Sequence, residues 1–312
     1  MSRDLGGLVE GARAGSVRDI ARLISLVEDA SPEVPQIMAA LADRAGASLV
    51  IGVTGAPGVG KSTFTSALIT AYRSLGKRVG VLAVDPSSPF SGGALLGDRI
   101  RMQDHASDAG VYIRSMASRG HLGGLAATTT QALRVLEGIG FDIVIIETVG
   151  VGQSEVEIAG AADTTIVLLA PGMGDGIQAA KAGILEVGDV FVVNKADRDG
   201  ADSTVRELRA VIALADHSGG DWRPPVLKTV AYQGEGITEV VKAIGDHRDW
   251  LELSGKLDER RVRRAYDELE AIVLSRLRAT WKADDAMARA AERIAHGEID
   301  SYSAADDILG SA

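Results

Sequence analysis

The stretch Gly55-Ala56-Pro57-Gly58-Val59-Gly60-Lys61-Ser62-Thr63 decides how this chain can fold. An apolar run from Ser48 to Thr54 precedes it and a helix-permissive stretch from Phe64 to Leu75 follows it, which predicts a strand, a loop and a helix. In that context the spacing matches the Walker A motif, whose glycines let backbone N–H groups surround a polyphosphate at a helix N-terminus. All nine residues are therefore predicted to bind a nucleoside triphosphate, with Lys61 on the β and γ phosphates and Ser62 on Mg²⁺.

Composition limits the class of protein to which the chain can belong. Its 312 residues are 46% hydrophobic, enough for one large α/β domain with appendages or for two modest domains. The sequence has neither an apolar run long enough to cross a membrane nor a signal-peptide core, so we expect a soluble protein of the cytoplasm without a membrane partner. The lack of cysteine agrees with that compartment. A net charge of -10 argues against a nucleic-acid partner and favours a protein or a small molecule.

Five further apolar runs predict the sheet. They lie at residues 79–84, 141–146, 164–169, 189–193 and 226–230, and they are continuous rather than alternating. Strands of this kind are buried on both faces, as in a mainly parallel sheet covered by helices, so the expected fold class is α/β. Ligands of such sheets bind at the carboxyl ends of the strands. The residues that follow each run are therefore the candidate site.

Three acidic residues follow two of these runs, two of them directly. Asp85 ends the run at 79–84, Asp98 lies in a glycine-rich stretch, and Glu147 follows the run at 141–146. Carboxylate and hydroxyl oxygens suit Mg²⁺, so we expect these three residues and Ser62 to hold the ion. A turn-forming role before proline remains open for Asp85, and an ordinary loop position remains open for Asp98.

Glu147 also begins a segment that has the features of a switch. Gly150 is placed to sense the γ-phosphate through its N–H group, and Gln153 is placed to orient the attacking water. With Lys61 and Glu147, these are the expected catalytic residues. An ordinary polar loop residue is an equally open interpretation of Gln153.

Two further glycine-rich segments are expected to be loops. The first runs from Arg114 to Gly124 and carries Arg114 and Arg119, which either neutralise phosphate charge or are solvated. The second runs from Ala170 to Lys181 and leads into a helix. Loops so rich in glycine serve either tight geometry or motion, and the sequence leaves that choice open.

The tetrapeptide Asn194-Lys195-Ala196-Asp197 follows the run at 189–193 and matches the guanine-specificity motif Asn-Lys-x-Asp. Here the Asp197 carboxylate would accept hydrogen bonds from guanine N1–H and the exocyclic amine, while Lys195 packs its stem along the base. Adenine would leave that carboxylate unpaired, a difference that can reach about 10⁴-fold in affinity. Ala231, at the end of the last run, is placed to offer its N–H to the guanine carbonyl. Asn194 and Asp197 thus predict GTP and GDP as the nucleotides.

Helices are expected at both ends of the chain. Residues 1–45 are expected to form a helical lid on the core rather than a separate binding module. Their apolar stripe consists of Ile20, Leu23, Ile24 and Val27. A long helix is expected from Ser254 to about Trp281, with apolar residues at spacings of three and four. It either forms an arm that packs on a second subunit or lies along its own domain, and the pattern leaves both open.

The joint set of motifs resembles that of the MeaB/ArgK family of P-loop GTPases. The matching segments are Gly55–Thr63, Val84–Pro89, Gly92–Asp98, Arg119–Gly124, Glu147–Ser154 and Asn194–Asp197. The resemblance implies a G domain of the SIMIBI class at residues 46–250, an N-terminal helical extension at 1–45 and a C-terminal helical dimerisation arm at 251–312. It also implies that Ser62, Asp85, Asp98 and Glu147 are the magnesium-linked residues, and that the loop from Gly172 to about Lys181 is an extra switch.

The same resemblance implies a function. Proteins of that family bind the adenosylcobalamin-dependent methylmalonyl-CoA mutase or a related acyl-CoA mutase, gate the loading of its cofactor and protect it from inactivation. We therefore expect a Mg²⁺-dependent GTPase that is a homodimer and a chaperone of this mutase.

Three alternatives stay open. A metallochaperone GTPase for another metalloenzyme is disfavoured because the chain has no cysteine and its five histidines are scattered. A kinase linked to amino-acid transport would need a phosphoacceptor site, and none is evident in the sequence. A pure scaffold would retain its function after substitution of Lys61.

Overall fold

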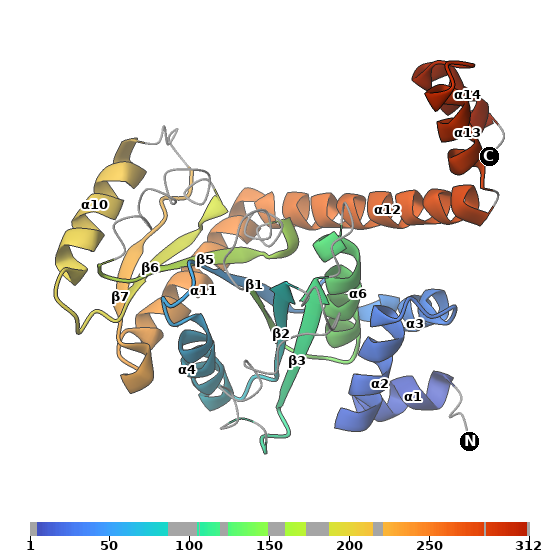
Figure 1. The fold of residues 1–312 in the computed structure, drawn as a ribbon. Coiled ribbons are helices and arrows are strands. Elements are labelled where there is room, and N and C mark those ends of the chain that lie inside the picture. Colours follow the sequence, from blue (N-terminus) through green and yellow to red (C-terminus); the bar gives the residue numbers. More distant parts are fainter. Residues whose placement is uncertain are drawn as a thin grey trace. The chain divides into compact units, whose positions relative to one another are not determined.

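A seven-stranded sheet is the centre of the computed structural model, which describes residues 5–86, 105, 107–118, 124–148, 160–172, 187–214, 221–283 and 285–310. Within that part every strand pair is parallel, and the strand order is β3-β2-β4-β1-β5-β6-β7 (Figure 1). The strands are β1 Leu49–Thr54, β2 Val79–Pro86, β3 Val111–Ser118, β4 Ile143–Thr148, β5 Thr164–Leu169, β6 Val190–Asn194 and β7 Val226–Thr229. The predicted α/β fold with a parallel sheet is confirmed.

Helices cover both faces of the sheet, which explains the continuous apolar runs. On one face α4 (Lys61–Ser74) and α11 (Ile237–Ser254) share a core with alternate residues of β1, β4 and β5. The other residues of these strands pack on the opposite face, against α6 (Gly124–Gly138) and α10 (Ala201–Leu214). Strands β1, β4, β5 and β6 are thus buried along their whole length, as expected for a parallel sheet.

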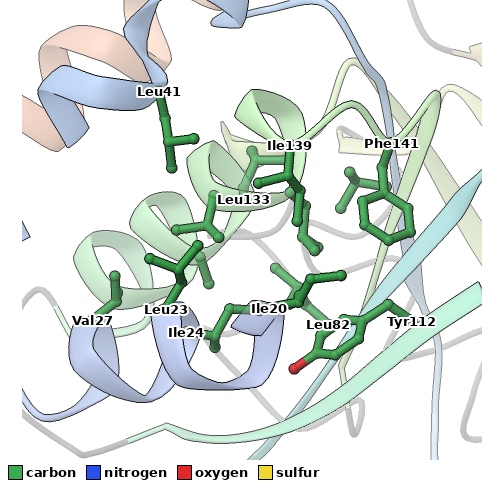
Figure 2. Close-up of a cluster of buried hydrophobic side chains, with 14 of the residues drawn as sticks. Ile20, Leu23, Ile24, Val27, Leu41, Leu82, Tyr112, Leu133, Ile139 and Phe141 are labelled. Atoms are coloured by element: carbon green, nitrogen blue, oxygen red, sulfur yellow. The ribbon is translucent and has the colours of Figure 1, made fainter. Parts of the chain in front are cut away.

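The three N-terminal helices belong to the core on the face of the sheet that α6 covers. They are α1 Leu5–Arg13, α2 Val17–Glu28 and α3 Val34–Leu41, followed by the short 3-10 helix η1 Ala42–Arg44. Figure 2 shows the predicted stripe of α2 facing Leu133 of α6 and Ile139, the residue that directly follows that helix. Ser16 caps α2 by accepting a hydrogen bond from the Asp19 N–H. The apolar stripe at the start of the chain therefore lies on the core, as the sequence predicted.

Strand β3 contradicts the expectation of a loop from Arg114 onward. Residues 111–118 pair with β2 along their whole length, and β3 lies at the edge of the sheet. The Arg114 guanidinium forms an ion pair with Glu28 of α2 and donates a hydrogen bond to Ser25. Its predicted role as a phosphate ligand or solvated loop residue is therefore wrong. An edge strand tolerates polar residues, which is why its sequence lacks the continuous apolar run of the inner strands.

The C-terminal part begins with the long helix α12, Lys256–Ala283, and continues with α13 Ala286–Ala295 and α14 Ser301–Gly310. The expected long helix is confirmed. The chain divides into two compact units, Met1–Arg264 and Ala265–Ala312, so the first turns of α12 belong to the unit that contains the sheet. Among the described helices, none combines the length and the apolar character needed to cross a membrane.

Candidate nucleotide site

The loop between β1 and α4 has the backbone that the glycine-rich motif predicts. The φ values of Gly55, Gly58 and Gly60 are +143°, +82° and +94°. Residues with a side chain rarely adopt positive φ values, whereas glycine adopts them readily. A Cβ on Gly55 would lie 2.3 Å from the carbonyl oxygen of Leu168 in β5, so the loop lies directly against that strand. Helix α4 begins at Lys61, and its N-terminus therefore faces the loop.

Lys61 folds its side chain back over this loop. Its Nζ donates to the carbonyl oxygens of Gly55 at 2.7 Å and Ala56 at 3.2 Å, and the residue is buried. The loop carbonyl oxygens thus hold the ammonium group in place, and the N-terminus of α4, which begins at this residue, favours an anion. This arrangement can hold the phosphates of a nucleotide.

Ser62 and Glu147 place two oxygen donors next to the loop. Ser62 Oγ donates to Glu147 Oε1 at 2.9 Å, and both residues are buried. Neighbouring ligands of an octahedral Mg²⁺ with bonds of about 2.0–2.1 Å are about 2.9 Å apart, so this donor pair fits that ion. Glu147 lies within β4, in register with Val53 of β1 and Ala83 of β2.

The other predicted metal and switch residues are less completely described. Asp85 lies at the carboxyl end of β2, one residue beyond Val84, which is in register with Thr148 of β4. Its backbone is therefore close to that of Glu147. Asp98, Gly150 and Gln153 lie outside the described residues, as does Arg119. Their roles stay predictions.

The guanine motif is joined to the phosphate loop by Asn194. This buried residue ends β6, and its Nδ2 donates to the carbonyl oxygen of Val59 at 2.9 Å. Its Oδ1 accepts from Thr229 Oγ1 at 3.0 Å and from the Ala231 N–H at 3.2 Å. The amide that the sequence assigns to the guanine carbonyl is thus engaged with Asn194 in this structure, and its contact with a base stays a prediction.

Lys195 and Asp197 are the next two residues of the guanine motif after Asn194. Lys195 has a left-handed φ of +56°, and its Nζ donates to the carbonyl oxygen of Gly58 at 2.6 Å. Asp197 is exposed, and its carboxylate has no hydrogen bond or ion pair with any described residue. An exposed carboxylate can accept hydrogen bonds from the two donors on the edge of guanine.

Comparison with known proteins identifies the family. A family model described as methylmalonyl Co-A mutase-associated GTPase MeaB matches residues 20–286. The chain belongs to the MeaB family. As a MeaB-family protein it is a GTPase that binds GTP and GDP and depends on Mg²⁺.

Individual relatives agree with this assignment. The MeaB-family chain is 46% identical over 307 residues to a putative GTPase of Pyrococcus abyssi, covering 97% of this chain and 95% of that protein. It is 38% identical over 272 residues to the mitochondrial methylmalonic aciduria type A homolog of Mus musculus, covering 82% of this chain and 65% of that protein. A crystal structure of LAO/AO transport system kinase matches with a TM-score of 0.73 at 28% identity, covering 99% of this chain and 98% of the other.

The MeaB-family chain also has a buried charged network that sequence analysis missed, at the amino ends of the strands. Asp189 precedes β6 and forms two hydrogen bonds with the guanidinium of Arg260 in α12, at 2.8 and 2.9 Å. Asp163 precedes β5, accepts from the Val50 N–H at 3.0 Å and lies 3.4 Å from Arg264. Acidic residues before two apolar runs and the arginine-rich start of a long helix were the available signals.

His247 of α11 is enclosed by the same network. Its Nδ1 lies 2.8 Å from Thr164 Oγ1, its Nε2 lies 3.3 Å from Asp189 Oδ1, and Trp222 and Trp250 contact its ring. Burial lowers the pKa of His247 to about 4. The negative charge of Asp189 raises this pKa, and the positive charge of Arg260 lowers it further. The imidazole is therefore neutral near pH 7.

This histidine makes stability depend on pH. Its pKa is about 6.5 in the unfolded chain and about 4 when folded, so its contribution is complete above pH 6.5 and is lost as the pH falls towards 4. We expect the free energy of unfolding, measured with urea, to lose about 2 kcal/mol from this group between pH 7 and pH 5.

The variant His247→Gln isolates that effect. Burial raises the pKa of Glu137, whose protonation acts in the opposite direction, so the quantity to compare is the difference between wild type and variant. The variant should lose the contribution of His247, whereas His296→Gln at an exposed position should keep the wild-type profile. Equal profiles for wild type and His247→Gln would contradict the assignment.

Proposed function

We propose that this MeaB-family GTPase is a chaperone that binds adenosylcobalamin-dependent methylmalonyl-CoA mutase or a related acyl-CoA mutase. In this proposal it gates cofactor loading and protects the mutase from inactivation. The observation that carries the proposal is the match of residues 20–286 to a family described as mutase-associated. The name of the mouse relative, which refers to methylmalonic aciduria, supports the same client.

The residues of the site fit hydrolysis of GTP by in-line attack of water. Lys61 and the loop N–H groups would hold the phosphates, and Asp197 would select guanine. Ser62 and Glu147, with Asp85 and Asp98, would hold Mg²⁺, which supplies charge neutralisation at the phosphates. Gly150 and Gln153 remain our proposals for sensing the γ-phosphate and orienting the water.

The client is tested by measuring GTP turnover of the purified protein alone, with apo-mutase and with cobalamin-loaded mutase. We expect the mutase to accelerate GTP hydrolysis, with ATP inert in each case. The two forms of the mutase should differ in their effect, because a protein that gates loading must distinguish them. Turnover that is unaffected by either form would leave the GTPase standing and exclude this client.

We also propose that the protein is a homodimer assembled through α12. An apolar stripe on this helix is exposed; Val262, Tyr266 and Leu269 are each about 60% accessible. Among the described residues of the unit Ala265–Ala312, Ala304 is the one buried apolar side chain, so this unit has almost no core of its own. A second copy of the chain would cover the stripe, and residues 251–312 would then be the dimerisation arm.

Sedimentation velocity tests the dimer. Wild type should sediment as a dimer, and the double variant Tyr266→Glu, Leu269→Glu should sediment as a monomer with a folded sheet domain. Ser275→Glu, which adds a charge at an exposed position on the opposite side of the same helix, is the matched control and should remain dimeric. A monomeric wild type, or a double variant that stays dimeric, would contradict the proposal.

The two other functions predict different products. A transport-linked kinase would transfer the γ-phosphate to a protein, whereas the proposed chaperone releases inorganic phosphate. A metallochaperone would bind a transition metal in stoichiometric amount. We retain the cytoplasm as the proposed location.

A further inference from the structure

Gly60 has surroundings that point to a role beyond phosphate binding. It is the last residue before α4, and a Cβ placed on it would lie 2.7 Å from Asn194 Nδ2 and 3.6 Å from Lys195 Cε. The first distance is shorter than a real Cβ can tolerate. A side chain at this position would therefore collide with the guanine motif.

The Asn194 side chain cannot move aside without losing hydrogen bonds. Its three partners are Val59, Thr229 and Ala231, at 2.9, 3.0 and 3.2 Å. All of them are buried, so water cannot replace the broken bonds cheaply. Asn194 itself is only 2% exposed, and its position is thus set jointly by the phosphate loop and β7.

The hydrogen bonds of Asn194 also set the position of Asp197, three residues further along the chain. Two backbone hydrogen bonds hold the intervening turn, from Ala196 N to the Thr229 carbonyl and from Arg198 N to the Lys195 carbonyl, both at 3.0 Å. A displacement of Asn194 would be passed to Asp197 through this turn. A side chain on Gly60 would therefore also shift Asp197, the residue proposed to bind the base.

We propose that Gly60 is a specificity-determining residue, because its missing side chain leaves the space in which Asn194 sets the position of Asp197. Gly60 then determines base preference as well as phosphate binding. The inference rests on the proposed selection of guanine by Asp197. It identifies a residue of the phosphate loop as part of the guanine site.

The test compares Gly60→Ala with Gly58→Ala. Gly58 also has a positive φ, +82°, but a Cβ there meets nothing within 4 Å, so this control reproduces the backbone strain without the collision. The measured quantity is the ratio of the dissociation constants for ADP and GDP. We expect this guanine preference to fall at least about 10-fold further in Gly60→Ala than in Gly58→Ala, as befits a displaced hydrogen-bonding group. Equal ratios in the two variants would overturn the inference.

Two further variants keep the outcome decisive. If Gly60→Ala does not fold, as judged by circular dichroism, Asn194→Ser with Gly60 intact should lower the ratio instead, and an unchanged ratio would overturn the inference. If Gly60→Ala folds, its effect should be much smaller in the Asn194→Ser background, because the collision partner is gone. The variant Asp197→Asn distinguishes failure of the proposed guanine site from failure of the role of Gly60. A ratio unchanged by Asp197→Asn refutes the guanine site. A ratio lowered by Asp197→Asn but not by Gly60→Ala refutes only the role of Gly60.

Discussion

Asp197→Asn should exchange the base preference of the enzyme from guanine to xanthine. In the proposed site the carboxylate would accept hydrogen bonds from N1–H and from the exocyclic amine of guanine, whereas an asparagine amide would oppose that amine with a second donor. Xanthine carries a carbonyl oxygen at the same position, which the amide can satisfy. We expect the affinity for GTP to fall by about 10³-fold or more, because a site built around polar pairing rejects a ligand that leaves a group unpaired.

Equilibrium binding of GDP and xanthosine diphosphate to wild type and Asp197→Asn checks this result. Asp199→Asn is the control, since it changes the same charge in the same exposed turn, two residues away. It should keep the preference for guanine. Undiminished binding of GDP by Asp197→Asn would place the base elsewhere.

Asp189→Ala should lower the stability of the folded protein strongly. Its carboxylate holds Arg260 through two hydrogen bonds and accepts from the Thr165 N–H at 2.8 Å. Removing it takes the acceptor from the buried Thr165 N–H and two hydrogen bonds from the half-buried Arg260 guanidinium, which keeps one bond to the Asp163 carbonyl oxygen. We expect a loss of about 2 kcal/mol or more in the free energy of unfolding, because a buried N–H and a half-buried charged donor each lose hydrogen bonds.

Urea denaturation measures this loss, and Asp202→Ala is the matched control. Asp202 also pairs with a cation, Lys228 at 3.0 Å, but both side chains are exposed. Exposed pairs contribute little, so the midpoint of Asp202→Ala should stay within error of wild type. Equal losses in the two variants would show that burial of the Asp189 pair is not what stabilises the protein.

The inner sheet could be predicted from sequence because each inner strand carries its own signal. Strands β1, β4 and β5 are buried on both faces, and this burial requires a continuous apolar run. The phosphate loop is equally local, since spacing and glycine conformation specify it within nine residues. Edge strand β3 lacked such a run, and its polar residues were mistaken for a loop.

Long-range polar contacts could not be predicted in the same way. Arg114 pairs with Glu28, and Arg260 with Asp189, across 86 and 71 residues of sequence. Nothing in the local pattern of either residue specifies its partner, because a charged side chain can pair wherever the fold brings an opposite charge. The hydrogen bonds that tie Asn194 to the phosphate loop are of the same kind, and only the three-dimensional structure brings their two ends together.

The proposed chaperone role requires that GTP hydrolysis change the affinity of the protein for its client, and titration calorimetry measures this affinity directly. The affinity of the protein for methylmalonyl-CoA mutase is measured with GDP and with a non-hydrolysable GTP analogue. We predict binding whose dissociation constant differs at least about 10-fold between the two nucleotides, a typical coupling between two sites. Equal affinity in both states, or no binding in either, would contradict the proposed role.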